Sequence, residues 1–137
     1  MPLYLLTVAP ETTTESQRLQ IAKKITRIHV DVTGAPPEFV NTYFSESPDL
    51  ENGFQALPDE RSVLIMGNIR DGRSDQAKRM LVDQIRQAVV QTLHCNPSEV
   101  EIRLRSVPAS RGMEGGRILP EPGSPEEAAW SLQGHDG

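Results

Sequence analysis

The amino terminus carries the first residue whose chemistry stands out. The sequence opens "MPLYLLTVAP", in which Pro2 precedes an apolar run. Proline has no N–H for a strand ladder, so one interpretation is that Pro2 simply occupies the first position of a strand. The alternative is that Met1 is removed because the following residue is small, which leaves a secondary amine at the terminus. Such an amine is a base or nucleophile that no internal residue supplies, and Pro2 is therefore a candidate catalytic group.

Three other places hold side chains that could bind or activate a small acid. Arg70 and Arg73 lie in "IRDGRSD", directly before an expected helix. Two guanidiniums beside the unpaired N–H groups of a helix start can form a carboxylate or phosphate site. The alternative is a basic turn that is only solvated. His29 lies on the apolar face of an expected helix. It is either a functional group or a histidine at the edge of the core that bonds to a carbonyl. Glu114 lies in the Gly-rich "SRGMEGGR" and could activate water or be merely solvated.

Two units of the same order position these residues. The first joins the apolar run from Leu3 to Val8, a helix and the strand-like "FVNTYFS", and the second joins "SVLIMGNI", a helix and "VEIRLRS". The first helix is predicted to start at a capping box, formed by Thr12 with Glu15 or by Thr14 with Gln17. Gly34 is expected to end this helix, and Ser74 is the expected N-cap of the second helix. The apolar stripes are Ile21, Ile25, Ile28 and Val32 in the first helix and Ala77, Leu81, Ile85, Ala88 and Val89 in the second.

The order of these elements predicts an α/β (α+β) fold. We expect two consecutive β-α-β units, about residues 2–46 and 62–106, in a four-stranded mixed sheet with both helices on one face, because crossover connections are right-handed. The other face would be uncovered, which favours a partner subunit. If the two units lie antiparallel, the start of the first strand is level with the end of the third. Pro2 and the turn with Arg70 and Arg73 could then share one cleft.

Composition and length narrow the class of protein. The 137 residues suit one domain, which we place at residues 1–123, and the acidic, Gly- and Pro-rich residues 124–137 are expected to form a flexible tail with Trp130 as its candidate anchor. A net charge of -5 argues against a nucleic-acid partner, and no apolar run approaches the ~20 residues of a membrane span. The single Cys95 excludes an internal disulfide and suits a cytoplasmic protein. The three scattered histidines show no metal-ligand spacing.

Taken together, these residues resemble the tautomerase superfamily and, within it, the group of cis-3-chloroacrylic acid dehalogenase. The similarity runs from Pro2 to about Gly123 and includes "IHVDVTG", "GNIRDGRSD" and "VPASRGMEGGRILPEPG". The resemblance implies the tautomerase fold and the following roles for residues of this chain. Pro2 would be the catalytic amino-terminal proline, and Glu114 would be the acid that activates water. Arg70 and Arg73 would bind the substrate carboxylate, and His29 would help to hold the carboxylate and the water.

One position departs from the pattern of the dehalogenases. Where they carry a tyrosine that assists the glutamate with water, this chain carries Arg103, a candidate modulator that stays charged and cannot accept a proton from water. From the resemblance we expect Arg103 to affect dehalogenation more than the proton transfer by Pro2.

The resemblance implies a cofactor-independent, metal-free tautomerase that acts on small enolisable or unsaturated carboxylates such as phenylpyruvate, assembled as a homotrimer. Two alternatives stay open: a hydratase or dehalogenase of acetylenic or 3-haloacrylic acids, and a non-enzymatic trimeric binding protein.

Overall fold

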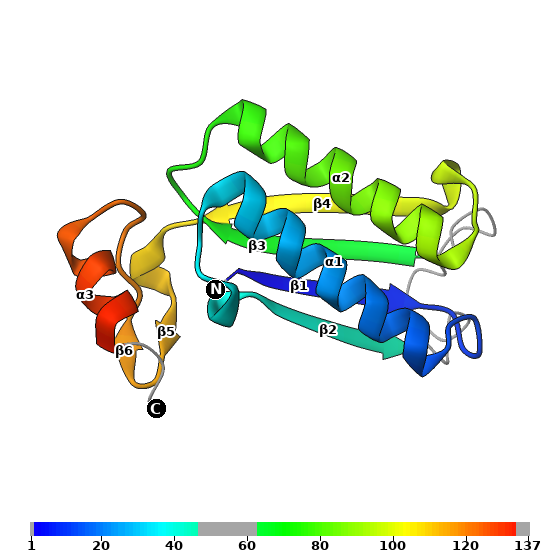
Figure 1. Ribbon diagram of the computed structural model, residues 1–137, viewed down its shortest axis with the longest axis horizontal. Coiled ribbons are helices and arrows are strands. Elements are labelled where there is room, and N and C mark those ends of the chain that lie inside the picture. The colour runs from blue at the N-terminus through cyan, green and yellow to red at the C-terminus, as the bar shows by residue number, and fades with distance from the viewer. Residues whose placement is uncertain (1, 47–62, 134–137) are drawn as a thin grey trace.

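The computed structural model describes residues 2–46 and 63–133 and forms one four-stranded sheet with two long helices (Figure 1). Strands β1 (Leu3–Val8) and β2 (Asn41–Glu46) flank helix α1 (Glu15–Thr33), and β3 (Val63–Arg70) and β4 (Val100–Val107) flank α2 (Asp75–Leu93). Short 3-10 turns, η1 (Pro37–Phe39), η2 (Pro97–Glu99) and η3 (Ala109–Arg111), precede β2, β4 and a C-terminal part. That part consists of the hairpin β5 (Met113–Glu114) and β6 (Arg117–Ile118), followed by helix α3 (Pro125–Gln133).

The strand order confirms the predicted mixed sheet. The order is β2-β1-β3-β4, with parallel pairing within each unit and antiparallel pairing between β1 and β3. Both long helices cover one face of the sheet (Figure 1). The strand burial alternates, so that Tyr4, Leu6 and Ile65 are fully buried beneath the helices, while Leu5 and Tyr43 on the other face are 41% and 57% exposed.

The local signals that start and end the helices act as predicted. Of the two candidate capping boxes, Thr14 and Gln17 form the one observed: the N–H of Gln17 donates to the Thr14 hydroxyl and the N–H of Thr14 donates to the Gln17 side chain. Gly34 ends α1 in the left-handed conformation, and the Ser74 hydroxyl accepts from the N–H of Ala77 at the start of α2. No described helix is long and apolar enough to cross a membrane.

The C-terminal segment expected to form a flexible tail contains a helix. Residues 125–133 form α3, since Ser124 accepts from the backbone of Glu127 and Pro125 suits the first helical position. The spacing of Ser124 and Glu127 is that of a capping box, a signal that the Gly- and Pro-rich composition conceals. The side chain of Trp130, the candidate anchor, lies outside what the structure describes. The domain boundary at residue 123 stays a prediction.

Candidate active site

Pro2 lies at the end of the sheet where β1 begins and β3 and β4 end (Figure 1). The antiparallel register pairs Leu3 with Asn68, which places Pro2 next to the last residues of β3. Pro2 is buried, and its carbonyl accepts a hydrogen bond of 3.1 Å from the N–H of Asn41. The predicted antiparallel arrangement of the two units is therefore confirmed, and it brings the chain terminus to the same edge as the turn that carries the arginines.

His29 is buried against β1 and forms a hydrogen-bonded pair with Tyr4. The histidine is 2% exposed, and its Nδ1 lies 2.7 Å from the Tyr4 hydroxyl. Tyr4 pairs across the sheet with Gly67, where an added β-carbon would come within 2.8 Å of the Tyr4 ring. The glycine therefore leaves the space in which the ring lies. His29 is not the carbonyl-bonded core histidine of the alternative interpretation, because its side-chain partner is a phenol.

The electrostatics keep both members of this pair neutral. Burial, together with the nearby cations Arg73 and Arg70, lowers the pKa of His29 to about 3. Burial also raises the pKa of the Tyr4 phenol well above its usual value. A neutral imidazole can still donate or accept a hydrogen bond, so His29 can hold a ligand without carrying charge near pH 7.

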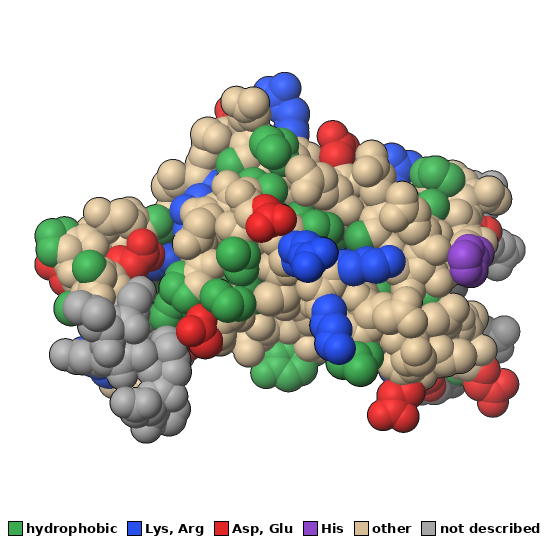
Figure 2. All heavy atoms as spheres, viewed as in Figure 1, with side chains coloured by type: hydrophobic (Ala, Val, Ile, Leu, Met, Phe, Trp, Pro, Cys, Tyr) green, Lys and Arg blue, Asp and Glu red, His purple; other side chains and the backbone are tan. Residues whose placement is uncertain are grey.

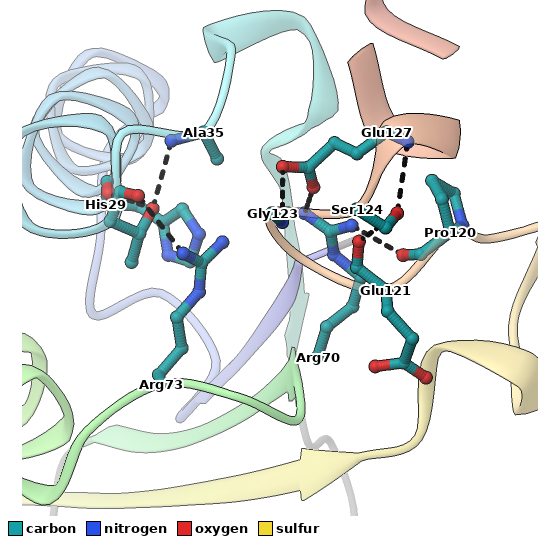
Figure 3. Close-up of polar contacts among 10 residues, drawn as sticks. His29, Ala35, Arg70, Arg73, Pro120, Glu121, Gly123, Ser124 and Glu127 are labelled. Carbon is teal, nitrogen blue, oxygen red and sulfur yellow. Dashed lines mark hydrogen bonds and ion pairs between the residues drawn. The ribbon is translucent and has the colours of Figure 1, made fainter. Parts of the chain in front are cut away.

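Arg73 connects the two units at this edge. It lies in the turn after β3, one residue before the N-cap Ser74, and its Nη1 donates a hydrogen bond of 3.1 Å to the carbonyl of Thr33 at the end of α1. Partial burial and the neighbouring Arg70 lower the pKa of its guanidinium. Figure 3 shows the Arg73 side chain directed toward the part of α1 that carries His29.

Arg70 is the last residue of β3, and its side chain points to the C-terminal part instead. It is 8% exposed, its Nη1 donates to the carbonyl of Pro120 at 2.7 Å, and its Nη2 lies 2.6 Å from a carboxylate oxygen of Glu127 in α3 (Figure 3). The two arginines are close enough to influence each other electrostatically, but their guanidiniums contact different groups. At the junction between the C-terminal part and the sheet, Figure 2 shows basic side chains beside acidic ones.

Glu114 lies in a hollow on the sheet face opposite the helices. It belongs to the β5-β6 hairpin, and the hollow of about 360 Å³ is lined by Leu3, Asn41, Tyr43, Asn68, Gly112, Met113, Glu114 and Leu119. Leu3, which follows Pro2 in the chain, lines this hollow on the side of the sheet away from His29. The candidate residues are thus gathered at one edge, but on two sides of the start of β1.

Arg103 lies further from this edge, in the middle of β4. Its side chain is 69% exposed and ion-paired with Glu101 at 2.8 Å. It pairs with Met66 of β3, whereas the hollow of Glu114 includes Asn68, two residues further along that strand. Within residues 2–46 and 63–133, no three His, Cys, Asp or Glu side chains are grouped to hold a metal ion.

Two residues of this edge, Tyr4 and Glu127, are missed by sequence reasoning. Tyr4 belongs to an apolar strand in which nothing distinguishes it, although it lies two positions after Pro2 and so on the same face. Glu127 lies in a stretch whose composition is that of a tail. Its capping-box spacing with Ser124 predicts a helix start, but no sequence signal indicates that its carboxylate contacts Arg70.

Comparison with known proteins gives consistent results for nearly the whole chain. Residues 1–135 match the model of a family described as "Putative oxalocrotonate tautomerase enzyme". A solved structure of N1, a member of the cis-3-chloroacrylic acid dehalogenase family, is 30% identical with a TM-score of 0.83 and 96% of each chain covered. A probable tautomerase of Halalkalibacterium halodurans is 37% identical over 49 residues, which are 35% of this chain and 80% of that protein. A fused 4-OT, solved as an asymmetric trimer, shares the fold at 21% identity with a TM-score of 0.75, covering 85% of this chain and 95% of its own.

Proposed function

Because the chain belongs to the tautomerase superfamily, we propose that it is a cofactor-independent tautomerase of small enolisable carboxylates such as phenylpyruvate. The observation that carries the proposal is the position of Pro2 at the edge where β3 ends and Arg73 and the neutral His29 lie. In this proposal Met1 is removed and the secondary amine of Pro2 is the proton carrier. Guanidinium groups nearby disfavour the charged form of an amine, which favours a neutral base at the start of the reaction.

In the proposed reaction the two arginines bind the carboxylate, and the amine of Pro2 moves one proton. Neutral Pro2 takes the proton of the enol hydroxyl and returns it to the adjacent carbon, so that the keto form leaves and the amine is neutral again. General acid–base transfer of this kind contributes roughly 10²–10⁴-fold to a rate. The Tyr4 phenol, which keeps its proton, can donate to Nδ1 of His29. The histidine then carries its own proton on Nε2 and can donate it in a hydrogen bond to the bound acid.

Water addition to an acetylenic or 3-haloacrylic acid is the second candidate activity. It is favoured by the position of Glu114 in a hollow that Leu3, the residue after Pro2, also lines, and by the similarity to a member of the cis-3-chloroacrylic acid dehalogenase family. In this activity Glu114 would activate the water and charged Pro2 would supply the proton, while His29, on the other side of β1, would help to hold the carboxylate. With Arg103 in place of a tyrosine, we expect it to be the weaker of the two activities.

Two substitutions separate these activities. Arg73→Ala should weaken both by at least about tenfold, because removing a charge-assisted hydrogen bond from a partly buried site costs on the order of 2 kcal/mol or more. Glu114→Gln should abolish water addition while leaving phenylpyruvate tautomerisation within a few-fold of the parent, since that reaction needs no water. The exposed Arg79→Ala is the matched control for loss of charge.

The readouts are ultraviolet absorbance of the phenylpyruvate enol and release of the hydrated product or halide. Equal loss of both activities in Glu114→Gln would contradict a specific role in water activation. A complete absence of turnover by the parent with an unblocked Pro2 would favour the binding-protein alternative instead.

The proposed assembly is a homotrimer that covers the sheet face opposite the helices. Leu5 and Tyr43 are exposed on this face, and the fold is shared with a fused 4-OT that was solved as a trimer. Light scattering should report three times the 15.2 kDa chain mass at micromolar concentration. A monomer would contradict the proposal.

A further inference from the structure

The guanidinium of Arg70 is already occupied by groups of its own chain. One terminal nitrogen donates to the carbonyl of Pro120 and the other contacts the carboxylate of Glu127 (Figure 3). A carboxylate ligand normally uses two adjacent N–H groups of arginine at once. Because both terminal nitrogens of Arg70 are engaged, a second carboxylate that binds Arg70 in this bidentate way competes with Glu127 for Nη2.

Glu127 is held firmly as an anion at this position. Its second carboxylate oxygen accepts a hydrogen bond of 3.0 Å from the N–H of Gly123, and its own N–H donates to Ser124. Partial burial opposes ionisation, but the Gly123 hydrogen bond and the cations Arg70 and Arg73 outweigh it and lower the pKa of Glu127. Glu127 therefore places a negative charge among the same two arginines that a substrate carboxylate is proposed to bind.

In the part of α3 whose side chains the structure describes, residues 125–129, Glu127 makes the main contact with the rest of the chain. Of the helix residues whose side chains are described, Pro125, Glu126, Ala128 and Ala129 are exposed and Glu127 alone is partly buried. These five residues thus contribute little apolar burial, and segments with few such contacts open at low free-energy cost. The ion pair with Arg70 can accordingly break without disturbing the sheet and its two long helices.

From these contacts we propose that Glu127 is an affinity- and specificity-determining residue of the carboxylate site. Its carboxylate occupies Arg70 in the resting protein, and a substrate carboxylate must displace it, together with α3, before it can bind both arginines. This inference rests on the proposed function for the identity of the ligand, a small monocarboxylate, but not for any catalytic step. Removing the charge of Glu127 should therefore strengthen binding, whereas removing a supporting residue of Arg70 would weaken it.

The test is the binding of benzoate, an unreactive aryl carboxylate, to the full chain and to two matched variants. Glu127→Gln keeps the size of the side chain and removes its charge, and Glu126→Gln does the same on an exposed neighbour in the same turn. By calorimetric titration, Glu127→Gln should bind benzoate about fivefold more tightly than the parent, an effect in the range of a partly exposed ion pair. Glu126→Gln should stay within twofold, and uncharged benzamide should not distinguish the three proteins.

Kinetics add a readout that a merely structural role would not produce. In Glu127→Gln the KM for phenylpyruvate should fall by the same factor as the dissociation constant of benzoate, with kcat within twofold of the parent. If benzoate binding is unchanged or weaker in Glu127→Gln, the inference is overturned and Glu127 instead holds Arg70 in its binding position. Tighter benzoate binding without any turnover would reject the proposed reaction but leave this inference standing.

A second measurement uses the unmutated protein, in case the substitution disturbs folding. Saturating benzoate should accelerate amide hydrogen exchange in the peptide that contains residues 124–133, because the helix leaves Arg70 when the ligand binds. Slower or unchanged exchange in this peptide would show that the ligand binds with α3 in place, and would also overturn the inference.

Discussion

Helices α1 and α2 are built alike, but they differ at the buried position of His29 and Val89. Each spans 19 residues, starts at a hydroxyl N-cap and ends at a left-handed residue. Their equivalent positions are related by one constant shift in residue number: Thr14 and Ser74, Ile21 and Leu81, Ile25 and Ile85, His29 and Val89, and Gly34 and His94.

His29 and Val89 occupy equivalent buried positions but differ in chemical type. Both side chains are almost completely buried, at 2% and 0% exposure, so the fold needs only an apolar group at this position. The first unit has a titratable ring at this position, beside Tyr4 and close to two arginines. Burial and these cations lower the pKa of that ring to about 3. The second unit has valine at this position and contributes Arg70 from the end of β3 and Arg73 from the turn that follows. The pair of units therefore divides the candidate site between them.

The largest expected effect comes from making the two helices the same at this position. His29→Val should lower kcat/KM for phenylpyruvate by on the order of 10²-fold, the usual effect of losing one positioned hydrogen-bond donor. The matched change Val89→Ala should instead lower the free energy of unfolding by about 2 kcal/mol and leave the turnover of the folded protein near that of the parent. Circular dichroism verifies folding of both variants. Full activity of His29→Val would mean that His29 is only a core residue.

The next effect concerns the pH dependence of stability. Below about pH 6.5 the unfolded chain protonates His29, whereas the folded protein resists protonation until about pH 3. The free energy of unfolding should therefore fall as the pH falls through this window, by at most about 1.4 kcal/mol per pH unit. His29→Gln, which does not titrate, should lack this contribution. Urea unfolding of both proteins at pH 7 and 4.5 measures it, and a difference between them that does not change with pH would contradict the neutral buried histidine.

The smallest effect compares the two helix ends. His94 has a φ of 56°, a conformation that favours glycine, and Gly34 has a φ of 75° with open space around its α-carbon. His94→Gly should raise the free energy of unfolding by about 0.5–1 kcal/mol, and Gly34→Ala should lower it by about 1 kcal/mol. Thermal or urea unfolding measures both. Two changes of the same sign would show that the helix ends are not equivalent.

The equivalence of the units also explains how far the sequence could predict the fold. Local signals such as the Thr14 capping box, the Ile21 and Ile25 stripe and Gly34 act within one helix, so spacing alone reveals them. The meeting of Pro2 with the end of β3 follows from topology, because antiparallel units leave only one edge at which these ends coincide.

Contacts between distant segments could not be predicted in this way. The hydrogen bond between Tyr4 and His29 joins residues 25 apart in sequence, and its formation depends on the space left by Gly67. The ion pair of Arg70 with Glu127 depends on where a short helix packs after a hairpin, which composition does not specify. Motif matching identifies Pro2, His29 and the two arginines at this edge, whereas the partners of each depend on the packed structure.

The amine of Pro2 is the central element of the proposed reaction, and blocking it is the most direct test. Intact mass should first show that the mature chain has lost Met1. Phenylpyruvate tautomerisation is then compared between this protein and a preparation that retains Met1, with both checked for the same circular dichroism. We predict a loss of at least about 10²-fold in the blocked protein, because the amine of Pro2 has become an amide that can no longer carry the proton. Equal turnover by the two preparations would contradict a catalytic role for Pro2.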